Sequence, residues 1–266
     1  MLAQYDIGEL SVRVMQITSD RATVPSVSYT APAGWKVLGG GATVNWSGHG
    51  NLLYASYPES ESTWTASAKS HSKVDQATIS IRVVIARLRN GSPIPDPDHI
   101  IAENTSADPT LMPETSVALP GDGWSMTGGG AKVDWSGYGV LLTGSYPEGN
   151  GTAWRATSKA HSKPDHSGRI TAYLIAVRDS FLVGRGVRTQ IKTCDSGMAL
   201  IPSAHCSLDW GTFLIGGGGR ANWTGHGQLL TASNFVDQHT WFVSAKAHDK
   251  PANGTVTAFA IGVRPR

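Results

Sequence analysis

The fold of this protein is decided by the stretch Gly39-Gly40-Gly41-Ala42-Thr43-Val44-Asn45-Trp46-Ser47-Gly48-His49-Gly50, which occurs three times with small changes. The second copy begins at Gly128 and the third at Gly217. The tryptophans of the three copies are 89 and 88 residues apart; they are Trp46, Trp135 and Trp223. Similarity at a fixed spacing indicates one structural unit repeated three times along the chain.

Further features recur at the same spacing. Each glycine run is preceded by a tryptophan and followed by another; these are Trp35, Trp124 and Trp210, then Trp64, Trp154 and Trp241. A Lys-x-His sequence comes next in each unit, and a β-branched and aromatic run ending in Arg closes it. All nine tryptophans of the chain therefore fall into three sets of three, an order that a scatter of core residues would not produce.

The repeats divide the chain into residues 1–92, 93–181 and 182–266. The connector at 90–98 is rich in proline and is expected to be exposed, whereas the apolar connector at 179–187 is expected to pack against the protein. Low charge, many glycines and the absence of helix-forming runs predict an all-β protein. We expect three internal repeats of about 88 residues in one pseudo-threefold, β-prism-like body. Three small sandwiches in tandem are the alternative.

The second unit shows the expected strands. Period-2 alternation predicts one strand over 124–127 leading into the glycines and another over 131–135. Further strands are expected over 141–146, 152–158 and 169–178, with a tight turn at Glu148-Gly149-Asn150-Gly151. This gives four to five strands per unit, and no helix is expected anywhere.

Composition excludes several classes of protein. The net charge is +2 and the basic residues are scattered, so nucleic acid is not an expected partner. No apolar run approaches the ~18 residues of a membrane-spanning helix. The first ten residues are mixed and do not have the pattern of a signal peptide, although the resemblance described below favours a secreted or cell-surface location.

The chain has two cysteines, Cys194 and Cys206. They are twelve residues apart on strands that we expect to be adjacent, so they either form a disulfide or remain two buried thiols. Neither has histidines at metal-ligand spacing, so no metal or other cofactor is expected.

The loop after each glycine run is the first candidate binding site. A sugar is recognised by an aromatic face against its C–H groups and by polar side chains against its hydroxyls. Each loop offers such a set: Asn45, Trp46 and His49; Asp134, Trp135 and Tyr138; Asn222, Trp223 and His226. The tryptophans are equally suited to the core. The ring at each loop tip lies between two turn glycines and is therefore expected to be exposed.

The Lys-x-His sequences are the second candidate site. They consist of Lys69 and His71, Lys159 and His161, and Lys246 and His248. On a strand, residues two apart point to the same face, and this pair would suit an anionic group or sugar hydroxyls. The alternative is that each histidine holds the following polar turn while the lysine is solvated.

The sequence does not predict an enzyme. Glycoside hydrolysis needs two carboxylates held in opposition, and no acidic pair recurs in all three units. A Gly-x-Ser-x-Gly nucleophile elbow is absent, and no Lys-Ser/Thr follows the glycine runs as in phosphate-binding loops.

The order Leu38-Gly39-Gly40-Gly41-Ala42, Ser56-Tyr57-Pro58 and Trp64 resembles a repeat found in bacterial secreted and surface proteins. The threefold layout of Trp and Gly is similar to that of β-prism proteins, such as the vitelline-membrane outer-layer protein and plant-type lectins. The β-prism comparison is a likeness of fold and does not imply a function by itself. The triplicated loop residues favour a multivalent carbohydrate-binding protein with up to three related sites and with glycans as partners. A toxin or surface-interaction module, or a structural coat protein without a ligand, remains the alternative.

Overall fold

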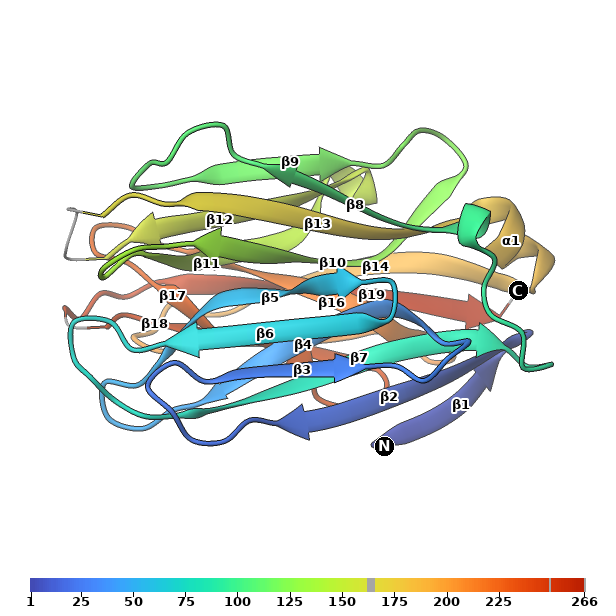
Figure 1. Ribbon diagram of the computed structural model, residues 1–266, viewed down its shortest axis with the longest axis horizontal. Coiled ribbons are helices and arrows are strands. Elements are labelled where there is room, and N and C mark those ends of the chain that lie inside the picture. The colour runs from blue at the N-terminus through green and yellow to red at the C-terminus, as the bar shows by residue number, and fades with distance from the viewer. Residues whose placement is uncertain (162–165, 249, 266) are drawn as a thin grey trace.

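The computed structural model describes residues 1–161, 166–248 and 250–265. It confirms an all-β protein, built from three antiparallel sheets. The strands run along the long axis of the body, and the short helix α1 (Asp179–Gly184) lies at one end (Figure 1).

Each sheet combines strands from two parts of the chain. The first sheet contains, in order, β1 (Ala3–Ile7), β2 (Leu10–Thr18), β7 (Thr78–Leu88), β4 (Lys36–Asn45), β17 (Leu229–Phe235), β18 (Thr240–Lys246) and β15 (Ser203–Ser207). The second contains β3 (Ser26–Thr30), β6 (Thr63–Lys69), β5 (Leu52–Ser60), β10 (Trp124–Asp134), β13 (Arg169–Arg178) and β8 (His99–Thr105). The third contains β14 (Val187–Asp195), β19 (Thr255–Pro265), β16 (Phe213–Asn222), β11 (Val140–Glu148), β12 (Ala153–Ala160) and β9 (Glu114–Ala118).

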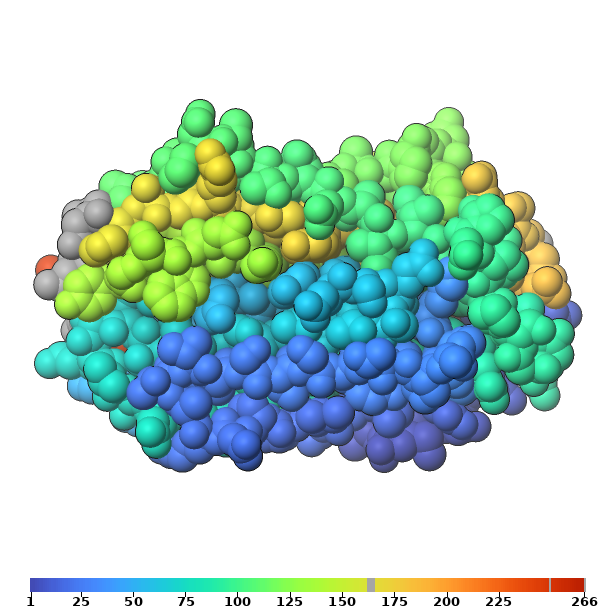
Figure 2. All heavy atoms as spheres, viewed as in Figure 1, coloured from blue at the N-terminus to red at the C-terminus, as the bar shows by residue number. Residues whose placement is uncertain are grey.

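The three parts of the chain are joined by three similar strand pairings. We call residues 1–92, 93–181 and 182–266 the first, second and third segments. Strand β5 of the first segment pairs with β10 of the second, β11 of the second with β16 of the third, and β17 of the third with β4 of the first. The segments therefore lie directly against one another, as Figure 2 shows for the first (blue to cyan) and second (green to yellow).

The glycine runs allow the closest approach between segments. A Cβ atom on Gly39 would lie 2.4 Å from the carbonyl oxygen of Ile215 and 2.9 Å from the Cα of Gly216. Gly128 meets Gly39 in the same way, and Gly216 meets Gly128. The three glycines thus contact one another in a closed cycle, and a larger residue at any of them would collide with backbone.

The middle glycine of each run packs against a buried tryptophan. A Cβ on Gly40 would lie 2.5 Å from the ring of Trp64, and the other two copies repeat this contact with Trp154 and Trp241. All three indoles are at most 1% exposed, and each donates its N–H to a serine hydroxyl. A buried indole normally needs such a partner, so these tryptophans belong to the core.

Three features differ from the sequence-based expectations. The stretch 124–134 forms one continuous strand, β10, because the glycines pair with β13 instead of turning. The connector after β13 forms the helix α1, which buries Phe181 and Leu182, so the expectation of no helix was wrong. The divergent part of each segment supplies two or more further strands, such as β8 and β9.

A disulfide joins Cys194 on β14 to Cys206 on β15. It links edge strands of two different sheets within the third segment. Among the described residues, no helix is long and apolar enough to cross a membrane.

Candidate functional site

The candidate loops gather at one end of the body, which we call the loop end. They span residues 46–50, 135–139 and 223–227, and they directly follow β4, β10 and β16. Their second glycine has a positive φ angle in each copy, and this turn folds the loop back over its own tryptophan. The ring at each tip is exposed; the three rings belong to His49, Tyr138 and His226.

A lysine from one segment holds the loop of the next. The ammonium of Lys69 donates a hydrogen bond of 2.5 Å to the carbonyl oxygen of Tyr138 and lies 4.2 Å from the ring centroid of Trp135. The other two junctions repeat the arrangement: Lys159 contacts His226 and Trp223, and Lys246 contacts His49 and Trp46. The two sets of residues that the sequence identified separately are thus joined across segment boundaries.

These lysines are almost completely buried, with 3–4% of their surface exposed. Burial lowers the pKa of Lys69 and of Lys159 to about 8, because a charged ammonium loses hydration there. One face of each loop tryptophan is therefore covered by a cation and cannot stack on a sugar. The alternative in which these lysines are solvated is therefore wrong in that respect.

The histidines of the Lys-x-His sequences meet at the centre of the loop end. The ring centroids of His71, His161 and His248 are 5.3–6.0 Å apart. Each also lies beside the tip of the next loop: His71 beside Tyr138, His161 beside His226, and His248 beside His49. The following turn residues 162–165 and 249 lie outside the described part of the chain. Within the described part, no group of His, Cys, Asp or Glu is arranged to hold a metal ion.

The polar residues before the loop tryptophans have different environments. Asn45 and Asn222 each donate two hydrogen bonds to hydroxyl groups on the neighbouring strand, so their amides support the sheet. Asp134 is exposed and lies 3.7 Å from the ammonium of Lys132. The junction of the first and second segments therefore offers a carboxylate, whereas the other two junctions offer an amide that is already hydrogen-bonded.

An open groove of about 620 Å³, which we call the middle groove, lies at this junction of the first and second segments. Asp134 and Trp135 line it together with Tyr54 and Arg169. Tyr54 comes from the first segment and meets the indole of Trp135 edge to face, with ring centroids 5.7 Å apart. Two aromatic rings, a carboxylate and a guanidinium thus converge on a space large enough for a sugar ring.

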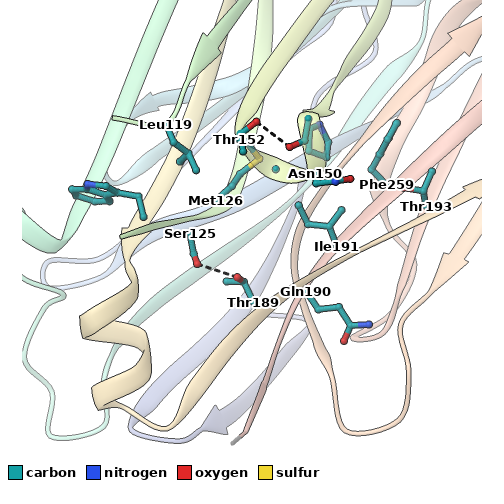
Figure 3. Close-up of a pocket in the computed structure, with 14 residues that line it drawn as sticks. Leu119, Ser125, Met126, Asn150, Thr152, Thr189, Gln190, Ile191, Thr193 and Phe259 are labelled. Carbon is teal, nitrogen blue, oxygen red and sulfur yellow. Dashed lines mark hydrogen bonds between the residues drawn. The ribbon is translucent and has the colours of Figure 1, made fainter. Parts of the chain in front are cut away.

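A second groove of about 620 Å³ was not predicted from the sequence (Figure 3). It lies near the start of β10, at the opposite end of that strand from the loops, and we call this the groove end. Trp124, Asn150 and Phe259 are among its lining residues. Asn150 is the one non-glycine residue with a positive φ among the described residues, and the Gly-Asn-Gly turn was a visible signal for this hairpin.

Comparisons with known proteins give no family for this chain. No protein-family model matches the sequence, and none of the curated proteins matches it either.

Proposed function

We propose that the protein is a multivalent, lectin-like glycan-binding protein with three related sites at the loop end. The observation that carries this proposal is the middle groove, where two residues selected from the sequence, Asp134 and Trp135, line one open cavity with Tyr54. Aromatic edges and faces contact the C–H groups of a sugar, while a carboxylate accepts hydrogen bonds from its hydroxyls. The proposed activity is binding without catalysis.

The repeated contacts support three sites on one rigid body. The same Lys–Trp contacts and the same lysine hydrogen bonds to the tip carbonyls hold all three loops, so their exposed rings keep fixed positions relative to one another. Three weak sites on one body gain avidity for a glycan-coated surface without any new contact. We also propose a pseudo-threefold, β-prism-like arrangement, which the three matching strand pairings favour.

A secreted or cell-surface location forms part of the proposal. The Cys194–Cys206 disulfide favours it, because disulfides persist mainly in oxidising compartments.

A screen of the wild-type protein against immobilised glycans tests the proposal. We expect binding to at least one glycan, and at least tenfold weaker binding by Asp134→Asn, because the amide loses the charge that accepts hydroxyl hydrogen bonds. Asp122→Asn is the matched control, since Asp122 is also exposed but lies outside the groove. A folded protein that binds no glycan would rule the proposal out and leave a structural role.

One observation favours a surface-interaction module as the second candidate. Exposed apolar side chains surround the loop end; they include Val24, Leu111, Met112, Leu200 and Ile201. Backbone bonds from Ser70 to Thr23, Ala160 to Leu111 and Ala245 to Pro202 place these residues beside the histidine cluster. Exposed apolar side chains gathered in one place are typical of contact surfaces. Sedimentation with neutral phosphatidylcholine vesicles, in the absence of glycan, would favour this candidate over the first.

A further inference from the structure

The groove between the second and third segments has an uncharged lining. Its apolar walls include Leu119, Trp124, Met126, Ile191 and Phe259, and its polar groups are amides and hydroxyls. In Figure 3, Ser125 and Thr189 face each other across one side of the groove, and a hydrogen bond of 3.1 Å joins them. No charged side chain of the described residues lines the space itself. Behind the lining, Ser125 donates a hydrogen bond to Asp179 and Arg178 lies over the ring of Trp124, so one charge of each sign stands nearby and an uncharged ligand fits best.

The same place at the junction of the first and second segments is filled. Register identifies it, because Val37 and Met126 each precede the bulge that leads into a glycine run. The buried imidazole of His99 donates a hydrogen bond of 2.8 Å to the carbonyl oxygen of Val37. Beside it, Lys36 pairs with Asp96 at 2.6 Å and with Glu61 at 2.9 Å.

The junction of the third and first segments is filled by a different ring. Leu214 takes the position of Val37, and its carbonyl oxygen accepts a hydrogen bond of 3.0 Å from the phenol of Tyr5. The Tyr5 ring stacks on Phe213, with centroids 5.0 Å apart. In both filled junctions, therefore, a ring with one donor binds the carbonyl at the same register position.

At the open junction, the corresponding residues are too small to fill the space. Ser125 occupies the register position that Phe213 has in the third segment and Lys36 has in the first. Thr189 occupies the register position that His99 has in the second segment. The corresponding carbonyl belongs to Met126, which lines the groove. The groove thus keeps, at Met126, the acceptor position that binds a ring at the other two junctions.

We propose that this groove binds a neutral aromatic ring carrying a hydroxyl group, such as a free phenol or an exposed tyrosine side chain. The ring packs against Trp124, Ile191 and Phe259, and the hydroxyl donates to the carbonyl of Met126 as Tyr5 does to Leu214. This site is separate from the glycan sites at the loop end and does not depend on them.

The test uses p-cresol as the probe and follows backbone amide shifts of the full-length protein by NMR. We expect saturable shifts around Met126, Thr189 and Asn150, and binding of toluene at least tenfold weaker because toluene has no donor. N-acetyltyrosinamide distinguishes the sources: binding as tight as that of p-cresol indicates a tyrosine-bearing partner, and tenfold weaker binding indicates a free phenol.

Two variants act as matched controls. Thr189→His places the donor of His99 in the groove and should abolish p-cresol binding without lowering the melting temperature. Tyr5→Ala opens the equivalent place at the third–first junction and should create a second p-cresol site. Absence of binding to the wild-type protein, or binding that Thr189→His leaves unchanged, would overturn the proposal; a site that appears in Tyr5→Ala alone would do the same.

Discussion

The three segment junctions have the same contacts at the loop end and different contacts at the groove end. At the loop end, all three junctions use a buried lysine over a tryptophan and a histidine beside an exposed tip. At the groove end, one junction holds an ion pair and a histidine, another an aromatic stack, and the third an open groove. The contacts that hold the three segments together use the same residues at each junction. The residues at the groove end can differ between junctions without disrupting the strand pairings that join the segments.

The largest loss of stability is expected from disrupting the contact between the glycine runs, on which both ends of the molecule depend. Gly39→Ala would place a methyl group 2.4 Å from the carbonyl oxygen of Ile215, where neither backbone can move without disturbing the other segments. We expect a loss of more than about 4 kcal/mol in the free energy of unfolding, measured with urea. Gly197→Ala, which meets no atom within 4 Å, should stay within about 0.5 kcal/mol of wild type. Equal stability of the two variants would contradict the close approach of the glycine runs.

A smaller effect should appear in the pH dependence of the free energy of unfolding, through the two buried lysines Lys69 and Lys36. Burial lowers the pKa of Lys69 to about 8, so the unfolded chain binds more protons than the folded one from about pH 8 up to the ordinary lysine pKa. The contribution of Lys69 to the free energy of unfolding should therefore rise with pH across that window. Comparison of wild type with Lys69→Met between pH 7.5 and 10 measures it.

Lys36, at the groove end, should behave in the opposite way. Burial acts to lower its pKa, but hydrogen bonds to Asp96 and Glu61 outweigh this and raise it. Its stabilising contribution is present below the ordinary lysine pKa and is lost as the pH rises through the raised value. Comparison of wild type with Lys36→Met above pH 10 should thus give a slope of opposite sign to that found for Lys69. Slopes of the same sign for both lysines would contradict this difference between the two ends.

The sequence predicted the loop end better than the groove end. The period of the repeat and the alternation of apolar residues identified most strands and the recurring lysines, histidines and tryptophans of the loops. His166, whose ring centroid lies 6.1 Å from that of Tyr138, does not recur and was not predicted. The pairing of Lys69 with the loop of the following segment could not be predicted, because local patterns do not encode which segment lies beside which.

Equivalent positions in the sequence also proved different in space. Trp35 is 4% exposed and Trp210 is 98% exposed, although each precedes a glycine run. The longer approach to the third run leaves Thr212 buried and places Trp210 in the turn before β16. The groove at Trp124 was missed for a related reason: it exists because Ser125 and Thr189 are small, and a small residue carries no signal of its own.

The most direct test of the account is stepwise removal of the three loop tips. The substitutions His49→Ala, Tyr138→Ala and His226→Ala would be made singly, in pairs and all together. Binding of each variant would be measured to a surface coated with the glycan that gives the strongest signal in the screen. We predict that each removed tip lowers apparent affinity by roughly tenfold, with an unequal step for Tyr138, while the melting temperature stays nearly constant. A triple variant that binds as tightly as wild type, or that unfolds, would contradict three binding sites at the loop end.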